Sequence, residues 1–182
     1  MTAKNKLIIL TGAVLLGAIA AGSAISAQDK YTVKVPEGLA FSEFRGYEDW
    51  QTVAVSVTES SIKAILANPA MIQAYKEGTP GNGKPFPEGS KIAKIEWIKA
   101  KNPESPYFVE IPQSLKTVSF IEKDSRRFTD TRGWAYAQFV FDPASETFKP
   151  SAPLSATGHA CGFACHSAVK AADYIFTKYA RR

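Results

Sequence analysis

The sequence predicts an α+β fold dominated by an antiparallel β-sheet of about five strands, with a few helices. Three observations support this prediction. Several short stretches alternate apolar and polar side chains, which is the pattern of half-buried strands. Segments rich in glycine and proline separate these stretches and indicate turns and loops. Helix signals are few and short, and no internal repeat is found.

The chain begins with the features of a cleaved export signal. Two lysines precede an uncharged apolar run over residues 7–21, and small residues follow before the polar Gln28. We expect cleavage between Ala24 and Gln28, so that residues 1–27 form the signal. An uncleaved membrane anchor is the alternative, but the apolar run is shorter than the ~20 residues that a full span needs.

The remaining 155 residues, 28–182, suit a single domain with one core. The formal net charge of +5 falls to about +3 without the two lysines of the signal. This bias is too weak to argue for nucleic acid or an anionic membrane as a partner. We expect a soluble, exported domain.

The elements expected before residue 80 are mostly short. Val53, Val55 and Val57 alternate with smaller or polar residues, which indicates a half-buried strand. Asn68 followed by Pro69 is typical of a helix start, and Gly78 is typical of a helix end. The expected elements are a short edge strand at 31–36, a strand at 50–58, a helical turn at 61–66 and a helix that begins at Pro69.

Further along the chain, strands dominate. The stretch before residue 91 is a loop rich in glycine and proline, and the aromatic stretch after residue 133 is a strong strand. The expected elements are a loop at 79–90, strands at 91–99, 107–111, 115–121 and 134–141, a polar helical turn at 124–131, a Pro/Ser/Thr-rich arm at 142–158 and a helix at 167–179.

The C-terminal part carries both cysteines of the chain, Cys161 and Cys165, with His166 directly after the second. Two closely spaced cysteines followed by histidine are the pattern by which a chain holds haem through two thioether bonds, with the histidine on the iron. The usual spacing has two residues between the cysteines, whereas here there are three. We expect the extra residue to form a bulge, for which Gly162 supplies backbone freedom.

Three other interpretations of this motif compete with haem: a disulfide, a zinc site and a chance juxtaposition of these residues. A disulfide between Cys161 and Cys165 would close a very short loop and therefore stabilise little. A zinc site would need a fourth ligand besides the two cysteines and His166, and His159 is awkwardly close in sequence. Covalent haem is favoured, also because haem of this type is attached outside the cytoplasm, in keeping with the export signal.

The strand at 91–99 has an unusual face, on which Lys94 and Glu96 lie between Ile92 and Ile98. Spacing alone favours an exposed strand with an ion pair, and the alternative is a charged pair that faces a cofactor cavity. Similarly, Arg126 and Arg127 could bind haem propionates, although a solvated surface is the commoner outcome.

The second axial position of the iron is expected to be open. An electron-transfer haem usually has a second strong ligand, His or Met. His159 is tethered too near Cys161 to reach the opposite side, and Met71 is expected in the core on the apolar face of a helix. Water or substrate would then bind at this open position of the iron.

Several motifs, in order along almost the whole chain after the signal, resemble the cytochrome P-460 family. They are Tyr47-Glu-Asp-Trp50, Ile65-Leu-Ala-Asn68-Pro-Ala70, Pro85-Phe-Pro-Glu-Gly89, Ile92-Ala-Lys94-Ile-Glu-Trp97, Phe120-Ile-Glu-Lys123-Asp124-Ser125, Gly133-Trp134 and the ending from Cys161 to Tyr179. Members with three residues between the cysteines exist, so the spacing is a variant within the family.

The resemblance implies a mostly β, usually dimeric, periplasmic protein with one haem c. In the best-known members a lysine is also cross-linked to the haem, and these proteins oxidise hydroxylamine. Related proteins, the β-sheet cytochromes c′, lack that chemistry and bind nitric oxide or other small gases. The resemblance therefore leaves two hypotheses, a haem oxidoreductase that passes electrons to a soluble cytochrome and a gas-binding or electron-transfer protein.

The resemblance also implies particular site residues. Lys94 best matches the cross-linking lysine, and Lys91 is the weaker match. Catalytic members of the family place a carboxylate over the haem, for which Glu122 is the nearest match by order and Glu96 the competitor by geometry. The implied site therefore consists of Cys161 and Cys165 as haem attachments, His166 as iron ligand, and Lys94, Glu96 and Glu122 as catalytic candidates.

Overall fold

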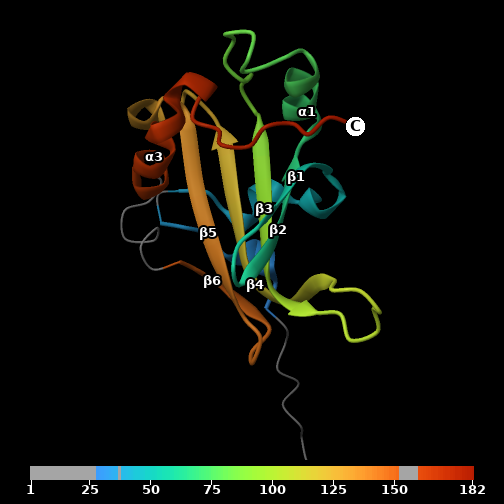
Figure 1. Ribbon diagram of the computed structural model, residues 1–182. Helices are drawn as coiled ribbons and strands as arrows, with labels where there is room; N and C mark the ends of the chain where they lie inside the picture. The colour runs from blue at the N-terminus through green and yellow to red at the C-terminus, as the bar shows by residue number, and fades with distance from the viewer. Residues whose placement is uncertain (1–27, 37, 152–159) are drawn as a thin grey trace, which may run out of the picture.

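The computed structural model describes residues 28–36, 38–151 and 160–182, and its centre is one antiparallel sheet of six strands (Figure 1). The strands are hydrogen-bonded in chain order, each to the next. The α+β class with a dominant sheet is thus confirmed, with six strands instead of about five. They are β1 (Gln51–Val57), β2 (Ser61–Ala67), β3 (Lys91–Lys101), β4 (Glu110–Lys123), β5 (Trp134–Asp142) and β6 (Thr147–Pro150).

The helical turn expected at 61–66 is wrong, because these residues form strand β2. Thr58 donates its backbone N–H to the carbonyl of Ser61 at 2.8 Å, so a tight turn folds β2 back onto β1. β2 then pairs with β1 on one side and β3 on the other. The spacing of its apolar residues fits a helix, but hydrogen bonding along both edges of a central strand outweighs this local preference.

Two other strand predictions differ from the structure at their ends. The strands expected at 107–111 and 115–121 are one long strand, β4, in which Pro112 lies at an irregularity opposite Lys99. A proline within a strand weakens the local signal because it lacks the N–H for the ladder. The arm at 142–158 contains the extra strand β6, which pairs with β5 along the edge of the sheet.

The N-terminal segment is built of turns and not of the edge strand expected at 31–36. The first turn, η1 (Lys30–Thr32), is capped by the Asp29 side chain, and beyond it Lys34 makes only an isolated bridge with Ala40. Two further 3₁₀ turns, η2 (Phe41–Phe44) and η3 (Tyr47–Asp49), carry aromatic side chains to the sheet.

Helix α1 (Pro69–Lys76) forms as its start signal predicts. The Asn68 side chain accepts a hydrogen bond from the backbone N–H of Met71 at 3.2 Å, and Pro69 occupies the first turn. Met71 is fully buried, which confirms its assignment to the core. The polar turn after β4 ends in a short 3₁₀ helix, η4 (Thr129–Thr131).

The helix expected at 167–179 is much shorter in the structure. Helix α3 (Ala160–His166) runs into the 3₁₀ segment η5 (Ser167–Ala172), which stops where Asp173 and Tyr174 adopt positive φ angles of 47° and 64°. The chain then crosses the end of the sheet as an extended segment toward α1 (Figure 1). There the Tyr75 hydroxyl donates to the carbonyl of Thr177 at 2.9 Å.

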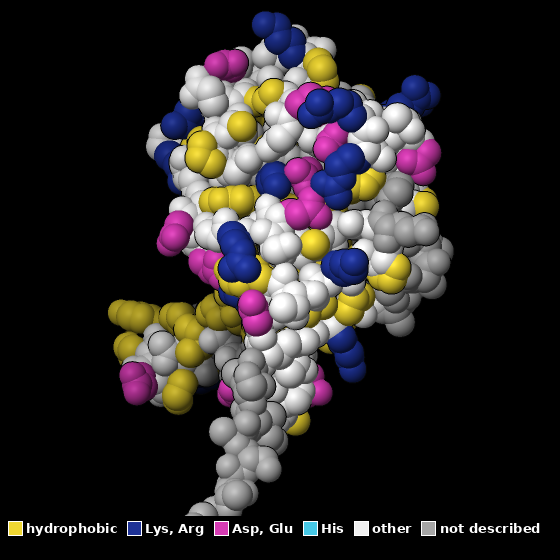
Figure 2. Space-filling view, turned by 180° about the vertical axis from the view of Figure 1, so that it is seen from behind, with side chains coloured by type: hydrophobic (Ala, Val, Ile, Leu, Met, Phe, Trp, Pro, Cys, Tyr) yellow, Lys and Arg dark blue, Asp and Glu magenta, His cyan; other side chains and the backbone are white. Residues whose placement is uncertain are grey.

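The two faces of the sheet are covered differently. One face, called the closed face below, packs against the N-terminal turns. This core includes Phe41, Phe44, Tyr47, Ala93, Val118, Phe120, Ala135, Ala137 and Phe139. Its outer surface carries scattered Lys, Arg, Asp and Glu side chains (Figure 2).

The other face, called the cavity face, packs against α1, the loop at 79–90 and the C-terminal segment. This second core includes Val53, Met71, Tyr75, Phe86, Ile92, Trp134, Tyr136 and Ile175. None of the helices among the described residues is long and apolar enough to cross a membrane. The expected signal at 1–27 and His159 lie outside the described residues.

Candidate functional site

A cavity of about 320 Å³ opens between the cavity face of the sheet and the C-terminal part of the chain. Strands β2 to β5, with Ser56 of β1, form its floor, and α3 with the extended segment at 175–177 forms the opposite wall. Both Lys94 and His166 line this cavity, so the fold brings together two residues that are 72 positions apart.

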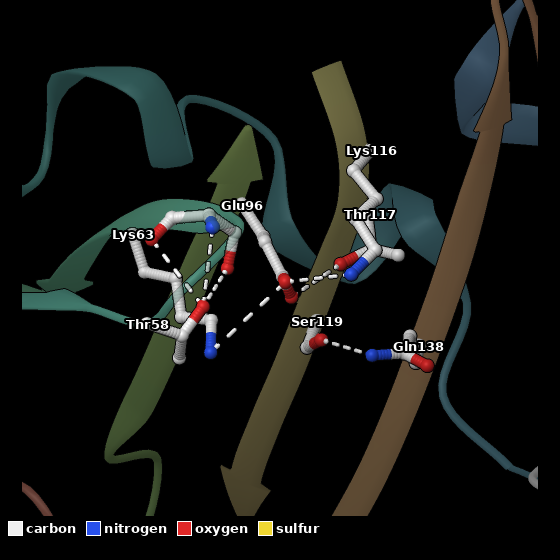
Figure 3. Close-up of polar contacts among 8 residues, drawn as sticks. Thr58, Lys63, Glu96, Lys116, Thr117, Ser119 and Gln138 are labelled. Carbon is white, nitrogen blue, oxygen red and sulfur yellow. Dashed lines mark hydrogen bonds and ion pairs between the residues drawn. The ribbon is translucent and has the colours of Figure 1, made fainter. Parts of the chain in front are cut away.

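The floor of the cavity follows directly from strand register. Ile65 pairs with Lys94, Lys94 with Ser119, and Ser119 with Gln138, so one row crosses four strands. All four side chains line the cavity. Gln138 donates its amide N–H to the Ser119 hydroxyl at 3.2 Å, as Figure 3 shows. The row is therefore polar at three of its four positions.

The motif that carries the cysteines forms helix α3, with Cys161 and Cys165 one turn apart on the same side. Both are free thiols. The expected bulge at Gly162 is wrong, since the three intervening residues complete a helical turn. Gly162 is needed for another reason: a Cβ atom there would lie 2.3 Å from Cβ of Tyr136. The glycine lets α3 approach β5 closely.

His166 is fixed in orientation at the end of α3. Its Nδ1 lies 2.6 Å from the carbonyl oxygen of Tyr174, a contact in which Nδ1–H must donate. The ring packs between Tyr136 and Phe176, at centroid distances of 4.6 and 4.9 Å. Burial lowers the pKa of His166, so the neutral imidazole, the form that binds metals, is favoured, and Nε2 is left to bind.

Lys94 is largely buried and is not paired with Glu96. Within the described residues its ammonium group has no hydrogen bond or ion pair. Burial lowers the pKa of Lys94 below its ordinary value. The negative charge of Glu96 opposes this shift, and the positive charge of Lys63 adds to it.

Glu96 has other cationic partners, Lys116 and Lys63 (Figure 3). Its carboxylate lies 3.0 Å from Lys116 Nζ and 4.0 Å from Lys63 Nζ, and it accepts a hydrogen bond from Thr117 at 3.4 Å. Burial raises the pKa of Glu96, but the hydrogen bond and charge of Lys116 with the charge of Lys63 lower it overall. Lys63 itself lines the cavity, so Glu96 contacts the site through this lysine.

Glu122 lies on the closed face, away from the cavity. It pairs with Lys91 at 3.1 Å, and alternation along β4 places it on the side of Phe120 and opposite to Ser119. Its second carboxylate oxygen is buried without a hydrogen-bond partner among the described residues. Burial raises the pKa of Glu122, while Lys91 opposes the shift. Of the two carboxylates, only Glu96 is near the cavity.

The arginines of the polar turn also lie away from the cavity lining. Arg127 donates to Glu43 at 2.5 Å, and Arg126 is exposed. The interpretation of these arginines as surface residues is therefore favoured over binding of propionates.

Three cavity residues were not identified from the sequence. Ser119 and Gln138 form part of the polar row, and the Tyr136 hydroxyl is buried without a hydrogen-bond partner among the described residues. A signal for Gln138 was present, because it is the one amide on the strand face that carries Trp134, Tyr136 and Val140. Ser119 could not be assigned without the register of β3 and β4.

The residues of this site fit a haem held by two thioethers. The free thiols of Cys161 and Cys165 lie one helical turn apart, His166 with its Nδ1 fixed lines the cavity, and the Tyr136 hydroxyl is buried without a hydrogen-bond partner among the described residues. The comparison with protein families supports the same group. The family model for Cytochrome P460 matches residues 44–177. A search of the curated proteins finds no match.

Proposed function

Because this chain belongs to the cytochrome P460 family, a family of haem c proteins, we propose that it is a periplasmic oxidoreductase with one covalently bound haem c. Its substrate would be hydroxylamine or nitric oxide, bound at an open axial position of the iron. The observation that carries this proposal is the position of Lys94, which is largely buried and has no hydrogen bond or ion pair to the described residues, in the cavity that His166 also lines.

The C-terminal residues would hold the haem. Cys161 and Cys165 would form the thioether bonds, and His166 would bind the iron through Nε2 while Nδ1–H stays on the Tyr174 carbonyl. The bound haem would supply a redox-active iron with one position free for a small ligand. The cavity walls would exclude bulk water from that position.

Lys94 would form an N–C bond to the haem edge in place of one N–H and one C–H bond, and the two electrons and two protons released would pass to an external oxidant such as a peroxide. A buried ammonium without a partner is costly, and attachment of the amine to the haem edge removes the charge. A lowered pKa increases the fraction of the neutral amine, which is the form that can act as a nucleophile. The alternative that Lys94 pairs with Glu96 is weakened, because Glu96 already contacts Lys116 and Lys63.

Glu96 is the better candidate for the acceptor of substrate protons. It contacts Lys63, which lines the cavity, whereas Glu122 contacts Lys91 on the closed face. A proton released in the cavity would reach Glu96 through an intervening water. The electrons would leave to a soluble cytochrome.

The chain would act outside the cytoplasm as a homodimer. Its N-terminal 27 residues have the pattern of an export signal. Apolar side chains gather on the projecting hairpin between β3 and β4 (Figure 2), where Tyr107 and Phe108 are each 78% exposed. An exposed apolar tip of this kind supports self-association.

Protease digestion followed by mass measurement of the haem peptides tests the proposal. We expect one haem-bearing species that joins the Cys161–Cys165 segment to the peptide of Lys94, together with a ferrous Soret band at unusually long wavelength. Lys94→Arg is the matched variant, since it keeps the positive charge but removes the amine. A wild-type haem peptide that contains only the Cys161–Cys165 segment, with an ordinary c-type spectrum, would contradict the oxidoreductase.

A second candidate function, binding of a diatomic gas without catalysis, is supported by a different observation. Among the described residues, no carboxylate lines the cavity, and its walls are mostly apolar around the polar row. Such a pocket suits a small neutral ligand. Loss of Lys94 cross-linking together with tight binding of nitric oxide to the ferrous protein would favour this alternative.

A further inference from the structure

We infer that Asp173 is a positioning residue that holds the Tyr174 carbonyl against His166 and thereby tunes the bond between His166 and the iron. This inference rests on the proposed role of His166 as iron ligand. It assigns a role to a residue outside the cavity lining, in the turn where the C-terminal segment leaves η5.

Asp173 connects three separate parts of the molecule. Its Oδ2 accepts hydrogen bonds from Lys123 Nζ at 2.7 Å and from the backbone N–H of Phe86 at 2.8 Å. Its Oδ1 accepts from Nε1 of Trp134 at 3.3 Å. These donors belong to the end of β4, the loop at 79–90 and the start of β5, so a single carboxylate fixes the turn to the rigid sheet.

The backbone at this turn needs such support. Asp173 and Tyr174 both have positive φ, which is uncommon for residues with a side chain and is unfavourable for a bulky aromatic residue. Two backbone hydrogen bonds also close the turn. The N–H of Asp173 donates to the carbonyl of Lys170 at 3.1 Å, and the N–H of Tyr174 donates to the carbonyl of Val169 at 3.2 Å. This conformation directs the Tyr174 carbonyl toward Nδ1 of His166.

The consequence for the iron ligand follows from the chemistry of imidazole. Donation from Nδ1–H to a carbonyl selects the tautomer with Nε2 free and increases the basicity of Nε2. A turn that is firmly held gives a short, well-oriented Nδ1–H···O bond. A looser turn lengthens this bond, which makes the histidine a weaker donor to the iron.

The test uses the haem-loaded protein and the iron–histidine stretching frequency of its ferrous form, measured by resonance Raman spectroscopy, together with the reduction potential. Asp173→Ala should lower the stretching frequency and make the potential more positive. Trp134→Phe, which removes one of the three donors, should shift both in the same direction by less. Asp173→Asn, which keeps one of the two oxygen acceptors and tolerates positive φ, should shift both values in the same direction but by less than Asp173→Ala.

Glu88→Gln is the matched control, because Glu88 also anchors the loop at 79–90. It accepts two hydrogen bonds from Ser125, at 2.8 and 2.6 Å, and makes no hydrogen bond or ion pair with the described residues of the turn at 173–174. This variant should leave the frequency and the potential unchanged.

Unchanged values in both Asp173→Ala and Trp134→Phe would overturn the inference. If Asp173→Ala does not fold, the result for Trp134→Phe decides. A wild-type protein that shows no iron–histidine mode after reduction would instead contradict the proposed role of His166. The failure of the inference and the failure of the proposed function are therefore distinguishable.

Discussion

The two faces of the sheet are formed by the same strands but carry different kinds of side chains. On the closed face, Phe41, Phe120 and Phe139 are fully buried and packed against one another, with centroid distances of 5.0 to 5.9 Å. On the cavity face of the same strands, the row from Lys94 to Gln138 leaves space and carries polar groups.

This difference assigns the stability of the fold mainly to the closed face and cofactor binding mainly to the cavity face. Large aromatic side chains on the closed face bury apolar area without gaps, and such packing dominates the free energy of folding. Small and polar side chains on the cavity face give up that packing, leaving room for a cofactor. Substitutions on the closed face should therefore change stability most, and substitutions on the cavity face should change cofactor binding most.

The largest effect is expected for the double variant Cys161→Ala, Cys165→Ala, which should lose covalent haem completely. Each single variant should retain haem weakly through the remaining thioether. Haem staining after denaturing electrophoresis measures this directly. Haem staining that persists in the double variant would contradict thioether attachment. It would also contradict the view that residues on the cavity face hold the cofactor.

On the closed face, Phe120→Ala should destabilise the protein by about 3–5 kcal/mol, because it leaves a cavity among tightly packed rings. Thermal or denaturant unfolding measures the change. Val55→Ala is the control, since this apolar side chain is 62% exposed on β1 and its truncation should cost little. Equal effects of the two variants would mean that the closed face does not carry the stability.

The sequence predicted best what depends on local patterns. The strands at 50–58, 91–99 and 134–141 follow from alternation, and the start of α1 follows from Asn68 and Pro69. The motif around Cys161 and Cys165 indicated a haem protein, and the family match supports it. Strand β2 was missed because its apolar spacing suits a helix, and only pairing with both neighbours makes it a strand.

The candidate site was predictable in part, for the same physical reason. Alternation put Lys94 and Glu96 on one face, but the partners of Glu96 come from β2 and β4 and depend on register. The family resemblance indicates Glu122 by its order in the chain, but the alternation of side chains along β4 places Glu122 on the closed face. The contact between Gly162 and Tyr136 joins residues from different elements, so no local pattern reveals it.

An intermediate effect is expected for Gly162→Ala, where α3 meets the cavity face. The added methyl group would overlap Tyr136. The side-chain and backbone shifts that relieve such an overlap typically destabilise a protein by about 1–3 kcal/mol. In a free helix the same change would be favourable by about 1 kcal/mol, so destabilisation would isolate the overlap. Denaturant unfolding of the haem-loaded protein measures whether the variant is less or more stable than the wild type. A more stable variant would show that α3 does not pack closely on β5.

The smallest expected effects sharpen the comparison, because each face has one buried glutamate whose pKa shifts in a different direction. The pKa of Glu96 is lowered by its lysine partners despite burial, so its stabilising contribution is present above the unfolded value of 4.5 and is lost as the pH falls through the folded value. The pKa of Glu122 is raised by burial, so its contribution becomes less favourable as the pH rises from 4.5 through the folded value. Glu96→Gln and Glu122→Gln should therefore give opposite slopes when the stability difference from the wild type is plotted against pH between about 3 and 7. Slopes of the same sign would show that the two faces do not differ in this way.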